Sequence, residues 1–333
     1  MRAYPVVATL TFCCLVFAHS ASGQQIAATD SGVALPVLPD STLLIEDVAR
    51  DARTGTWYIS SVHQRRVLAI GRDGQIRDFV PAGGDGLWAA FAMALDTARN
   101  RLWVTTAATP EGLGTPRSEL GRTAVLGFDM RTGQLAERHE LERDSTPRAL
   151  ADIALMEDGS LVVSDSRGGG LYALHPGRDA LDPIVPRGTF RSPQGPASIP
   201  GTDHVLVADY SRGLARVTRA TGAVRWLEGP AGFVLKGIDG IQLRGHSLIV
   251  VQNGVHPNRV ARLQMDDNYT RIVSADILDT GTPALSEPTH GTWVGEDFVF
   301  IASSGWAAMR EDGNFAPGAV LQRPQLRRIR MTR

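Results

Sequence analysis

A repeat along the chain is the feature that most constrains its fold. A turn-like segment, a short apolar stretch, a polar turn, a strongly apolar strand and a further strand recur in units of roughly 40–60 residues. The six units begin with the segments IEDVARD, FAMALDT, ADIALME, QGPASIP, DGIQLRG and HGTWVGE. A unit of this size does not bury its apolar face alone, so neighbouring units must stack on one another.

Each unit contains a β-rich run that is bounded by turn residues, which predicts a strand. These runs are 57–59, 102–104, 161–163, 205–207, 248–251 and 298–301. A third strand is expected at 66–70, 124–128, 170–174, 213–217, 259–263 and 326–331, and a weaker fourth one at places such as 76–80 and 224–227. Four-stranded units are typical of propeller blades, so we predict an all-β fold, a six-bladed β-propeller. A pair of β-sandwiches is the alternative, which the regular period disfavours.

The last unit shows no fourth strand after Met331. We therefore expect residues 33–44 to complete the final blade by pairing with residues 326–331. Closure of this kind removes exposed sheet edges.

The N-terminus has the pattern of a secretory signal peptide. Arg2 is followed by an apolar region at 6–18, which is shorter than the roughly 20 residues that span a bilayer. Small residues at 21–23 fit a cleavage site before Gln24. We expect residues 1–23 to be removed and residues 24–333 to form one exported domain, in the periplasm or outside the cell.

Cys13 and Cys14 are the only cysteines of the chain. Lipidation there is an alternative to cleavage, although Phe12 is a poor lipobox residue. Both cysteines lie in the segment expected to be removed, so the mature chain has neither a disulfide nor a thiolate nucleophile.

The charge of the chain is nearly balanced, with 34 basic and 35 acidic residues. The arginines are scattered rather than gathered in a stripe, so we expect no nucleic-acid partner. Later apolar runs are too short to span a membrane. A small molecule is the expected partner.

The first strand of each propeller blade lines the central channel, so residues at equivalent positions of the units converge there. The residues taken as equivalent in the six units are Glu46, Phe91, Ala151, Gln194, Asp239 and His290. Of these, Glu46 in the first unit and Asp239 in the fifth carry carboxylates. Two carboxylates in a partly desolvated site are costly unless a proton or a cation lies between them. Oxygen ligands suit a hard cation, calcium above all, and Gly240 permits a tight entry into the strand. A solvated turn at Glu46 and an Asx turn at Asp239 are the alternatives.

From about residue 43 to 331, the pattern resembles the senescence marker protein/gluconolactonase/luciferin-regenerating enzyme family of six-bladed propellers. The most specific segments are IEDVARD…WYIS and IDGIQL…LIVVQN. The resemblance implies that Glu46 and Asp239 bind Ca²⁺ or another divalent cation. A family asparagine falls on Gln194, which is therefore a third candidate ligand. A second falls on Ala151, which has no side-chain donor.

The resemblance also implies a role for His290, because related hydrolases have a histidine near the ion in the last blade. A satisfied structural histidine is the alternative at this position. Asn253 is a candidate to reach the channel. Asp165 and Asp209 recur at one blade position and are expected to make turn hydrogen bonds.

These features predict a calcium-dependent hydrolase of a lactone or related ester. The ion would polarise the carbonyl, and His290 or a carboxylate such as Asp239 would accept a proton from water. The sequence has no Gly-x-Ser-x-Gly nucleophile motif, which favours direct attack by water. The alternative is a non-enzymatic propeller that binds a small ligand or a protein, which the alanine at 151 favours. Loops at 105–122 and 303–317 are expected to set specificity.

Overall fold

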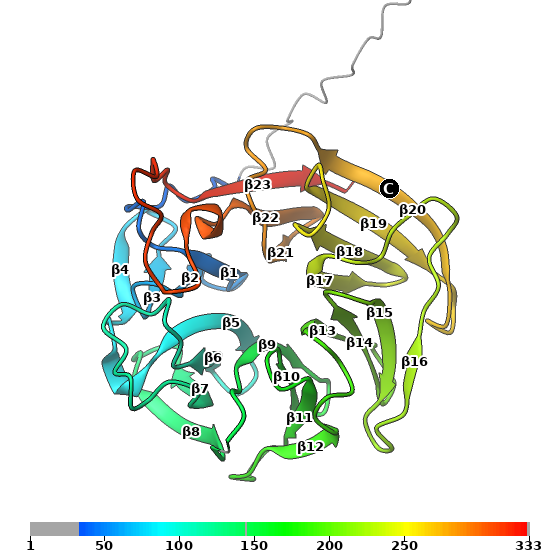
Figure 1. Cartoon of the computed structure of the whole chain (residues 1–333), viewed down its shortest axis with the longest axis horizontal. Coiled ribbons are helices and arrows are strands. Elements are labelled where there is room, and N and C mark those ends of the chain that lie inside the picture. The colour runs from blue at the N-terminus through cyan, green and yellow to red at the C-terminus, as the bar shows by residue number, and fades with distance from the viewer. Residues whose placement is uncertain (1–32, 144, 332–333) are drawn as a thin grey trace, which may run out of the picture. The chain divides into compact units, whose positions relative to one another are not determined.

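A computed structural model describes residues 33–143 and 145–331. These residues form six antiparallel sheets arranged around a central channel, with the first strand of each sheet nearest the channel (Figure 1). The prediction of a six-bladed propeller is confirmed. The expected signal peptide at 1–23 lies outside the described residues.

The strands of each blade follow one another in chain order from the channel outwards. Blade one contains β1 (Ile45–Arg50), β2 (Trp57–Ser61), β3 (Arg66–Ile70) and β4 (Ile76–Val80). Blade two contains β5 (Ala89–Asp96), β6 (Arg101–Ala107), β7 (Thr123–Asp129) and β8 (Leu135–Leu141). Blade three contains β9 (Leu150–Leu155), β10 (Leu161–Asp165), β11 (Gly170–Leu174) and β12 (Asp182–Val185).

Blades four to six continue the same pattern. Blade four contains β13 (Pro193–Ser198), β14 (His204–Asp209), β15 (Gly213–Thr218) and β16 (Val224–Trp226). Blade five contains β17 (Ile238–Arg244), β18 (Ser247–Gln252), β19 (Arg259–Met265) and β20 (Ile272–Thr280). Blade six contains β21 (Gly291–Val294), β22 (Asp297–Ser303) and β23 (Gln325–Arg330). Two short 3₁₀ helices, η1 (Gly84–Gly86) and η2 (Trp306–Ala308), lie in connecting segments.

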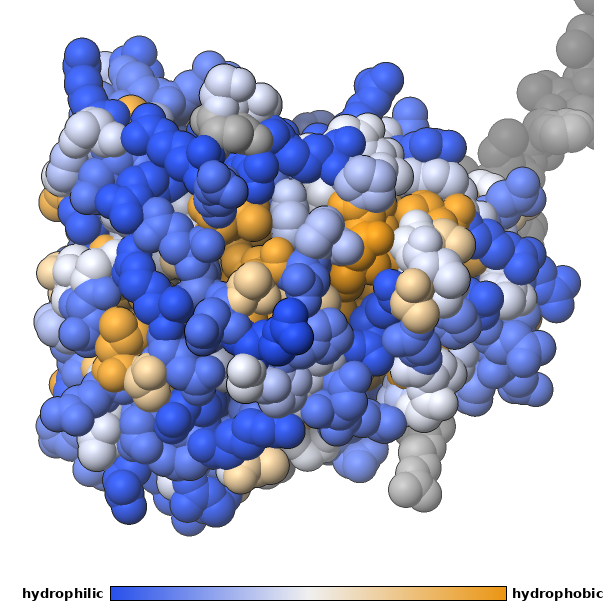
Figure 2. Space-filling view, turned by 90° about the horizontal axis from the view of Figure 1, so that it is seen from below, coloured by the Kyte–Doolittle hydropathy of each residue, from blue (hydrophilic) through white to orange (hydrophobic). Residues whose placement is uncertain are grey.

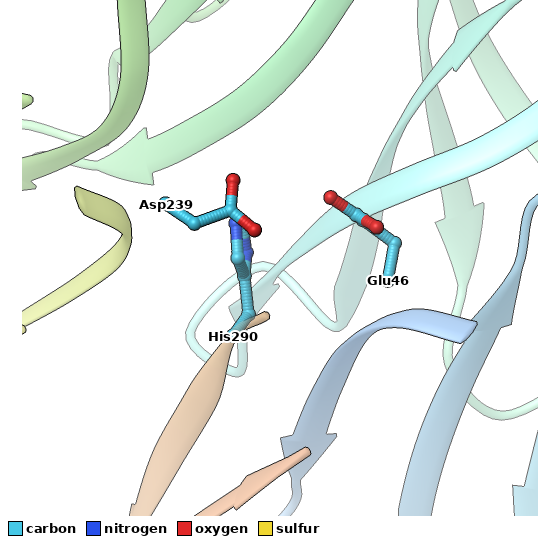
Figure 3. A group of neighbouring side chains, drawn as sticks. All are labelled: Glu46, Asp239 and His290. Atoms are coloured by element: carbon cyan, nitrogen blue, oxygen red, sulfur yellow. The ribbon is translucent and has the colours of Figure 1, made fainter. Parts of the chain in front are cut away.

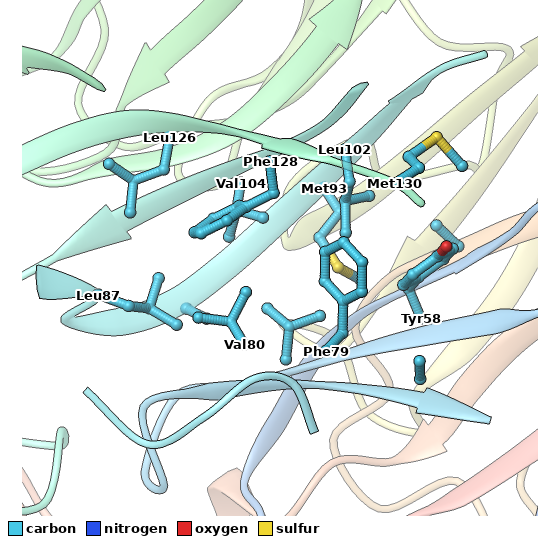
Figure 4. Close-up of a cluster of buried hydrophobic side chains, with 14 of the residues drawn as sticks. Tyr58, Phe79, Val80, Leu87, Met93, Leu102, Val104, Leu126, Phe128 and Met130 are labelled. Atoms are coloured by element: carbon cyan, nitrogen blue, oxygen red, sulfur yellow. The ribbon is translucent and has the colours of Figure 1, made fainter. Parts of the chain in front are cut away.

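Apolar side chains fill the spaces between neighbouring blades. Between blades one and two they form a continuous cluster (Figure 4), in which Tyr58 and Phe79 meet edge to face with ring centroids 5.0 Å apart. The labelled members are Tyr58, Phe79, Val80, Leu87, Met93, Leu102, Val104, Leu126, Phe128 and Met130. The stacking of repeats inferred from the sequence is thus the main source of the core.

The prediction that residues 33–44 complete the last blade is wrong. Within the described residues the sixth sheet has three strands, and residues 33–44 contain none. Instead, the carbonyl groups of Leu43 and Leu44 accept hydrogen bonds from Ser61 Oγ and from Val62 N. Because Leu38, Leu43 and Leu44 are buried, the segment follows its apolar side chains onto blade one.

Direct hydrogen bonds join the last blade to the first. Ile45 N donates to Ser304 O at 3.0 Å, and Thr289 Oγ1 donates to Glu46 O at 2.8 Å. The ring is therefore closed at the inner strands, close to the predicted metal ligand Glu46.

The outer surface is mainly hydrophilic. Figure 2 shows the side seen from below in Figure 1, where hydrophobic residues are visible as patches between hydrophilic ones. Among the described residues, no helix has the length and apolar character needed to cross a bilayer.

Candidate metal centre and active site

The inner strands are irregular at the position predicted to face the channel. In the first four blades the β-ladder is interrupted, between Ile45 and Val48 in blade one, and at corresponding points in the other three. Two residues of each strand, Glu46 and Asp47 in blade one, are displaced from the ladder. In blade five the irregularity leaves out Asp239. Bulges of this kind re-aim side chains, so these residues point away from the regular sheet faces.

Hydroxyl groups on the second strands hold the bulges in place. The displaced amide N–H groups donate from Asp47 to Ser60 Oγ at 2.9 Å, from Ala92 to Thr105 Oγ1 at 2.9 Å, and from Asp152 to Ser164 Oγ at 3.2 Å. In blade four the equivalent residue is Pro196, which has no N–H, and Val207 lies opposite it. The sequence thus supplies a hydrogen-bond acceptor where a buried donor requires one.

The structure brings Glu46, Asp239 and His290 together in the channel (Figure 3). One potential ligand atom from each side chain lies within 4.8 Å of the other two. In Figure 3 the carboxylate of Glu46 points toward that of Asp239, and the ring of His290 is directed toward Asp239. Asp239 and His290 are buried, whereas Glu46 is partly exposed.

Two glycines allow this close approach. A Cβ at Gly240 would lie 2.7 Å from Thr289 O and 3.0 Å from His290 Cα. A Cβ at Gly195, where φ is 38°, would lie 3.1 Å from Asp239 O. A larger residue at Gly240 would separate neighbouring inner strands, because real Cβ atoms do not approach backbone to 2.7 Å. At Gly195 the contact is tight and the positive φ disfavours a side chain.

Two further carboxylates surround the imidazole of His290. Asp152 Oδ1 lies 3.0 Å from Nε2, and Asp47 Oδ1 lies 3.7 Å from Nδ1. Since blade three lies opposite blade six (Figure 1), the pair of Asp152 and His290 spans the channel. The other oxygen of Asp47 accepts a 2.7 Å hydrogen bond from Met93 N, which fixes that carboxylate.

The channel continues on the far side of His290. A small cavity of about 30 Å³ lies beside Asp47, Asp152 and His290, and a larger one of about 240 Å³ is lined by residues farther along the inner strands, such as Val48 and Ile153. The ion pair of Asp152 and His290 lines the small cavity.

Glu46, Asp47 and Asp239 have raised pKa values in this site. Burial raises the pKa of Glu46 to about 8, with a further contribution from Asp239, and burial raises the pKa values of Asp47 and Asp239 to about 6. Burial alone would lower the pKa of His290, but the carboxylates, Asp152 above all, hold it well above its usual value. One imidazolium thus faces four carboxyl groups.

A divalent cation fits this arrangement. Carboxylates at such close range repel one another once ionised, and a bound cation replaces the protons that the raised pKa values indicate. The two carboxylates are ligands that calcium prefers, whereas an imidazole nitrogen is more typical of zinc, iron or other transition metals. Both nitrogens of His290 already face carboxylates, which favours Glu46 and Asp239 as the ligands and His290 as their neighbour.

Gln194 differs from its expected position in the repeat. The strand register aligns Gln194 with Ile45, and Gly195 with Glu46, so the equivalence drawn from the sequence is wrong by one residue. The amide of Gln194 donates to Ser192 Oγ at 3.0 Å. Its role as a metal ligand stays a prediction. Ala151 does align with Glu46, as expected.

Other polar residues support the two candidate ligands. Asn253 Nδ2 donates to Asp239 Oδ2 at 2.7 Å, and the hydroxyl of Tyr210 donates to Asn253 Oδ1 at 2.8 Å. The indole N–H of Trp306 donates to Glu46 Oε2. The expectation that Asn253 reaches the channel site is confirmed, but sequence reasoning missed both aromatic residues.

Asp165 and Asp209 have the turn role that the sequence predicted. Asp165 Oδ1 accepts hydrogen bonds from two backbone amides, Ala149 N at 2.9 Å and Gly168 N at 2.8 Å. Asp209 does the same with Ser211 N and Arg212 N, both at 3.0 Å. Both side chains are fully buried, and they stabilise turns between strands.

Comparisons with known proteins find similarity in structure rather than in sequence. No family model matches the chain, and no curated protein matches its sequence significantly. Among similar solved structures is a gluconolactonase from Xanthomonas campestris, with 17% identity, a TM-score of 0.55, and coverage of 78% of this chain and 83% of that one. Another is regucalcin, a calcium-binding protein from Agrobacterium tumefaciens, with 16% identity, a TM-score of 0.56, and coverage of 80% and 86%.

A third similar structure is a catalytically inactive histidine-to-alanine variant of virginiamycin B lyase from Staphylococcus aureus. It has 14% identity and a TM-score of 0.58, and the match covers 80% of each chain. At such low identities the likeness concerns the fold. The fold that the sequence resemblance implied is therefore the one observed, and it is shared with gluconolactonase and regucalcin.

Proposed function

We propose that this protein is an exported hydrolase that opens a lactone or cleaves a related ester with the help of a divalent cation, calcium in the first place. The observation that carries the proposal is the meeting of Glu46, Asp239 and His290 within 4.8 Å at the channel mouth. A gluconolactonase and a calcium-binding protein among the structures of the same fold support it.

The residues have separate roles in this proposal. Glu46 and Asp239 hold the cation, and the hydrogen bonds from Trp306 and Asn253 orient their carboxylates. When bound, the cation polarises the substrate carbonyl and stabilises negative charge on its oxygen. Water attacks the carbonyl directly, since neither a nucleophile motif nor a mature-chain cysteine is available.

His290 is the proton donor of the proposed site. Its imidazolium, held charged by the surrounding carboxylates, would protonate the leaving oxygen, while a carboxylate such as Asp239 would accept the proton of the attacking water. Asp152, 3.0 Å from Nε2, orients the ring, as the third group does in other proton-transfer constellations. The inactive lyase variant supports this assignment, because that protein of similar fold also depends on a histidine.

Metal analysis and turnover together test the proposal. Protein purified without chelator should contain about one divalent cation per chain at this site, and it should hydrolyse at least one member of a panel of lactones and aryl esters. Chelation should abolish turnover, and calcium should restore it. Metal-replete protein that turns over none of the panel would contradict the proposed activity.

The proposed export is tested separately. Mass spectrometry of protein expressed with its own N-terminus should show a mature chain that begins at Gln24. A full-length chain, or a lipid-modified one, would contradict cleavage at this site.

A binding propeller without enzymatic activity is the second candidate. It is favoured by the inner strands of blades three and four, because Ala151 and Gly195 occupy the positions equivalent to Glu46 and offer no side-chain ligand. This candidate predicts cation and ligand binding without turnover.

A further inference from the structure

We infer that the substrate carries an apolar alkyl or aryl substituent, which is held by an apolar wall beside the metal centre. The apolar wall consists of Phe91, Trp306 and Met309. The inference rests on the proposed function, because it concerns the substrate of the same site.

The wall lies next to Glu46. Phe91 occupies in blade two the displaced position that Glu46 occupies in blade one, so both point out of the ladder at the channel. Trp306 donates its indole N–H to Glu46, and Met309 follows in the same loop, where its amide donates to Trp306 O at 2.9 Å. Segments from two blades therefore place apolar side chains around one candidate ligand.

The wall has a rigid base and an accessible face. Its three side chains pack against Leu44, Val62 and Ala89, all of which are at most 1% exposed. Phe91, Trp306 and Met309 are themselves only partly buried. Large apolar side chains that keep an accessible face beside a charged centre gain stability when a ligand covers them.

The chemistry of the wall disfavours a polyhydroxylated substrate. The N–H of Trp306 is its one strong polar group, and that group is engaged by Glu46. Hydroxyl groups pressed against the wall would lose hydrogen bonds to water without replacement, which weakens binding. An alkyl or aryl substituent buries apolar surface without this loss.

Binding of non-hydrolysable ketones tests the wall without requiring turnover. Cyclopentanones with 2-alkyl chains from methyl to pentyl keep the ring and carbonyl of a lactone but lack its scissile bond. In calorimetric titrations of the calcium-loaded full chain, affinity should rise about two- to fourfold with each methylene that contacts the wall. A cyclopentanone with hydroxyl groups in place of the alkyl chain should show no gain over the parent ring.

Two variants of the wall and one control variant show which side chains cause the rise in ketone affinity with chain length. Phe91→Ser and Met309→Ser should each flatten the dependence on chain length. Val273→Ser removes a side chain that is 53% exposed on the outer strand β20, and it should keep the wild-type slope. If Phe91→Ser does not fold, Met309→Ser, in a connecting loop, still decides the question.

The outcomes separate this inference from the proposed function. The inference is wrong if ketone affinity does not rise with chain length in the wild type, or if it rises equally in both wall variants. This holds even if short lactones are hydrolysed. If ketone affinity rises with chain length but the protein turns over no lactone or ester, the wall does bind apolar substituents and the proposed hydrolase activity is wrong.

Discussion

Replacing Asp239 by asparagine separates two explanations of this residue, because the amide keeps an oxygen but loses the charge. Asp239 is 8% exposed, and its Oδ2 accepts a 2.7 Å hydrogen bond from Asn253. Burial raises its pKa to about 6, and the nearby Asp152 contributes. If Asp239 holds a cation, its charge should destabilise the metal-free protein and stabilise the metal-bound one.

The expected sizes follow from these observations. A carboxyl whose pKa rises from 3.8 to about 6 on folding opposes folding by about 1–3 kcal/mol at pH 8. Asp239→Asn should therefore raise the melting temperature of the metal-free protein by a few degrees. Wild-type protein should gain about 2.7 kcal/mol at a calcium concentration one hundred times Kd. If the substitution weakens binding about a hundredfold, that gain falls to about 0.4 kcal/mol at the same concentration.

Thermal melts at pH 8, first with chelator and then across a calcium titration, measure both effects. Asp209→Asn is the matched control, because Asp209 is also a buried aspartate in this fold but serves a turn. It should lower the melting temperature and leave the calcium response unchanged. If Asp239→Asn behaves in the same way as this control, the Asx-turn interpretation is correct and the metal hypothesis is wrong.

Three further perturbations probe the surroundings of the site. His290→Gln should reduce turnover at least about a hundredfold while metal content is retained. It should also lower the metal-free melting temperature, because Asp47 and Asp152 lose their positive partner. Wild-type rates in this variant would exclude a role in proton transfer. Trp306→Phe keeps an aromatic ring but removes the N–H that donates to Glu46. Calcium affinity in titrations should therefore fall at least about tenfold. Unchanged calcium affinity would show that this hydrogen bond does not orient a ligand. The metal-free protein should lose stability as the pH rises from about 5 to about 9. The folded-state pKa of Glu46, about 8, lies above its ordinary value of 4.5. The contribution of Glu46 to the free energy of unfolding is therefore fully present below about pH 4.5 and is lost as the pH passes through 8. Melts in saturating calcium should not show this loss, and equal pH profiles with and without calcium would contradict the assignment.

The blades could be predicted from the sequence because their signals are local. Strands β3 (Arg66–Ile70) and β4 (Ile76–Val80) have the bounds that alternation and turn residues predict. The position of residues 33–44 could not be predicted in this way. They were expected to supply the strand that the last unit lacks, but burial of their leucines on blade one decides where they lie, and that surface exists only once the blades have formed.

The candidate site was predictable only in part, and the bulges explain why. Glu46 and Asp239 stand out as charged residues at the start of apolar strands, but no feature of the sequence distinguishes Asp47 beside Glu46. The bulge turns both acidic residues of blade one out of the ladder. A one-residue change of register also moved Gln194 away from the position assigned to it, because strand faces alternate with every residue. The serines and threonine that hold the bulges, at 60, 105 and 164, are the signal that could have revealed this.

The two loops expected to set specificity meet in the structure, and this contact links recognition to the metal centre. A Cβ at Gly313 would lie 2.0 Å from Pro110 O, so glycine is required where the loop after β22 crosses the loop after β6. Trp306, in the first of these loops, belongs to the apolar wall and also donates to Glu46. A substrate that packs on Trp306 therefore contacts the side chain that orients a candidate ligand. Substitutions at Trp306 should alter substrate preference and cation affinity together, whereas Phe91, which lies in the wall on blade two, should alter preference alone.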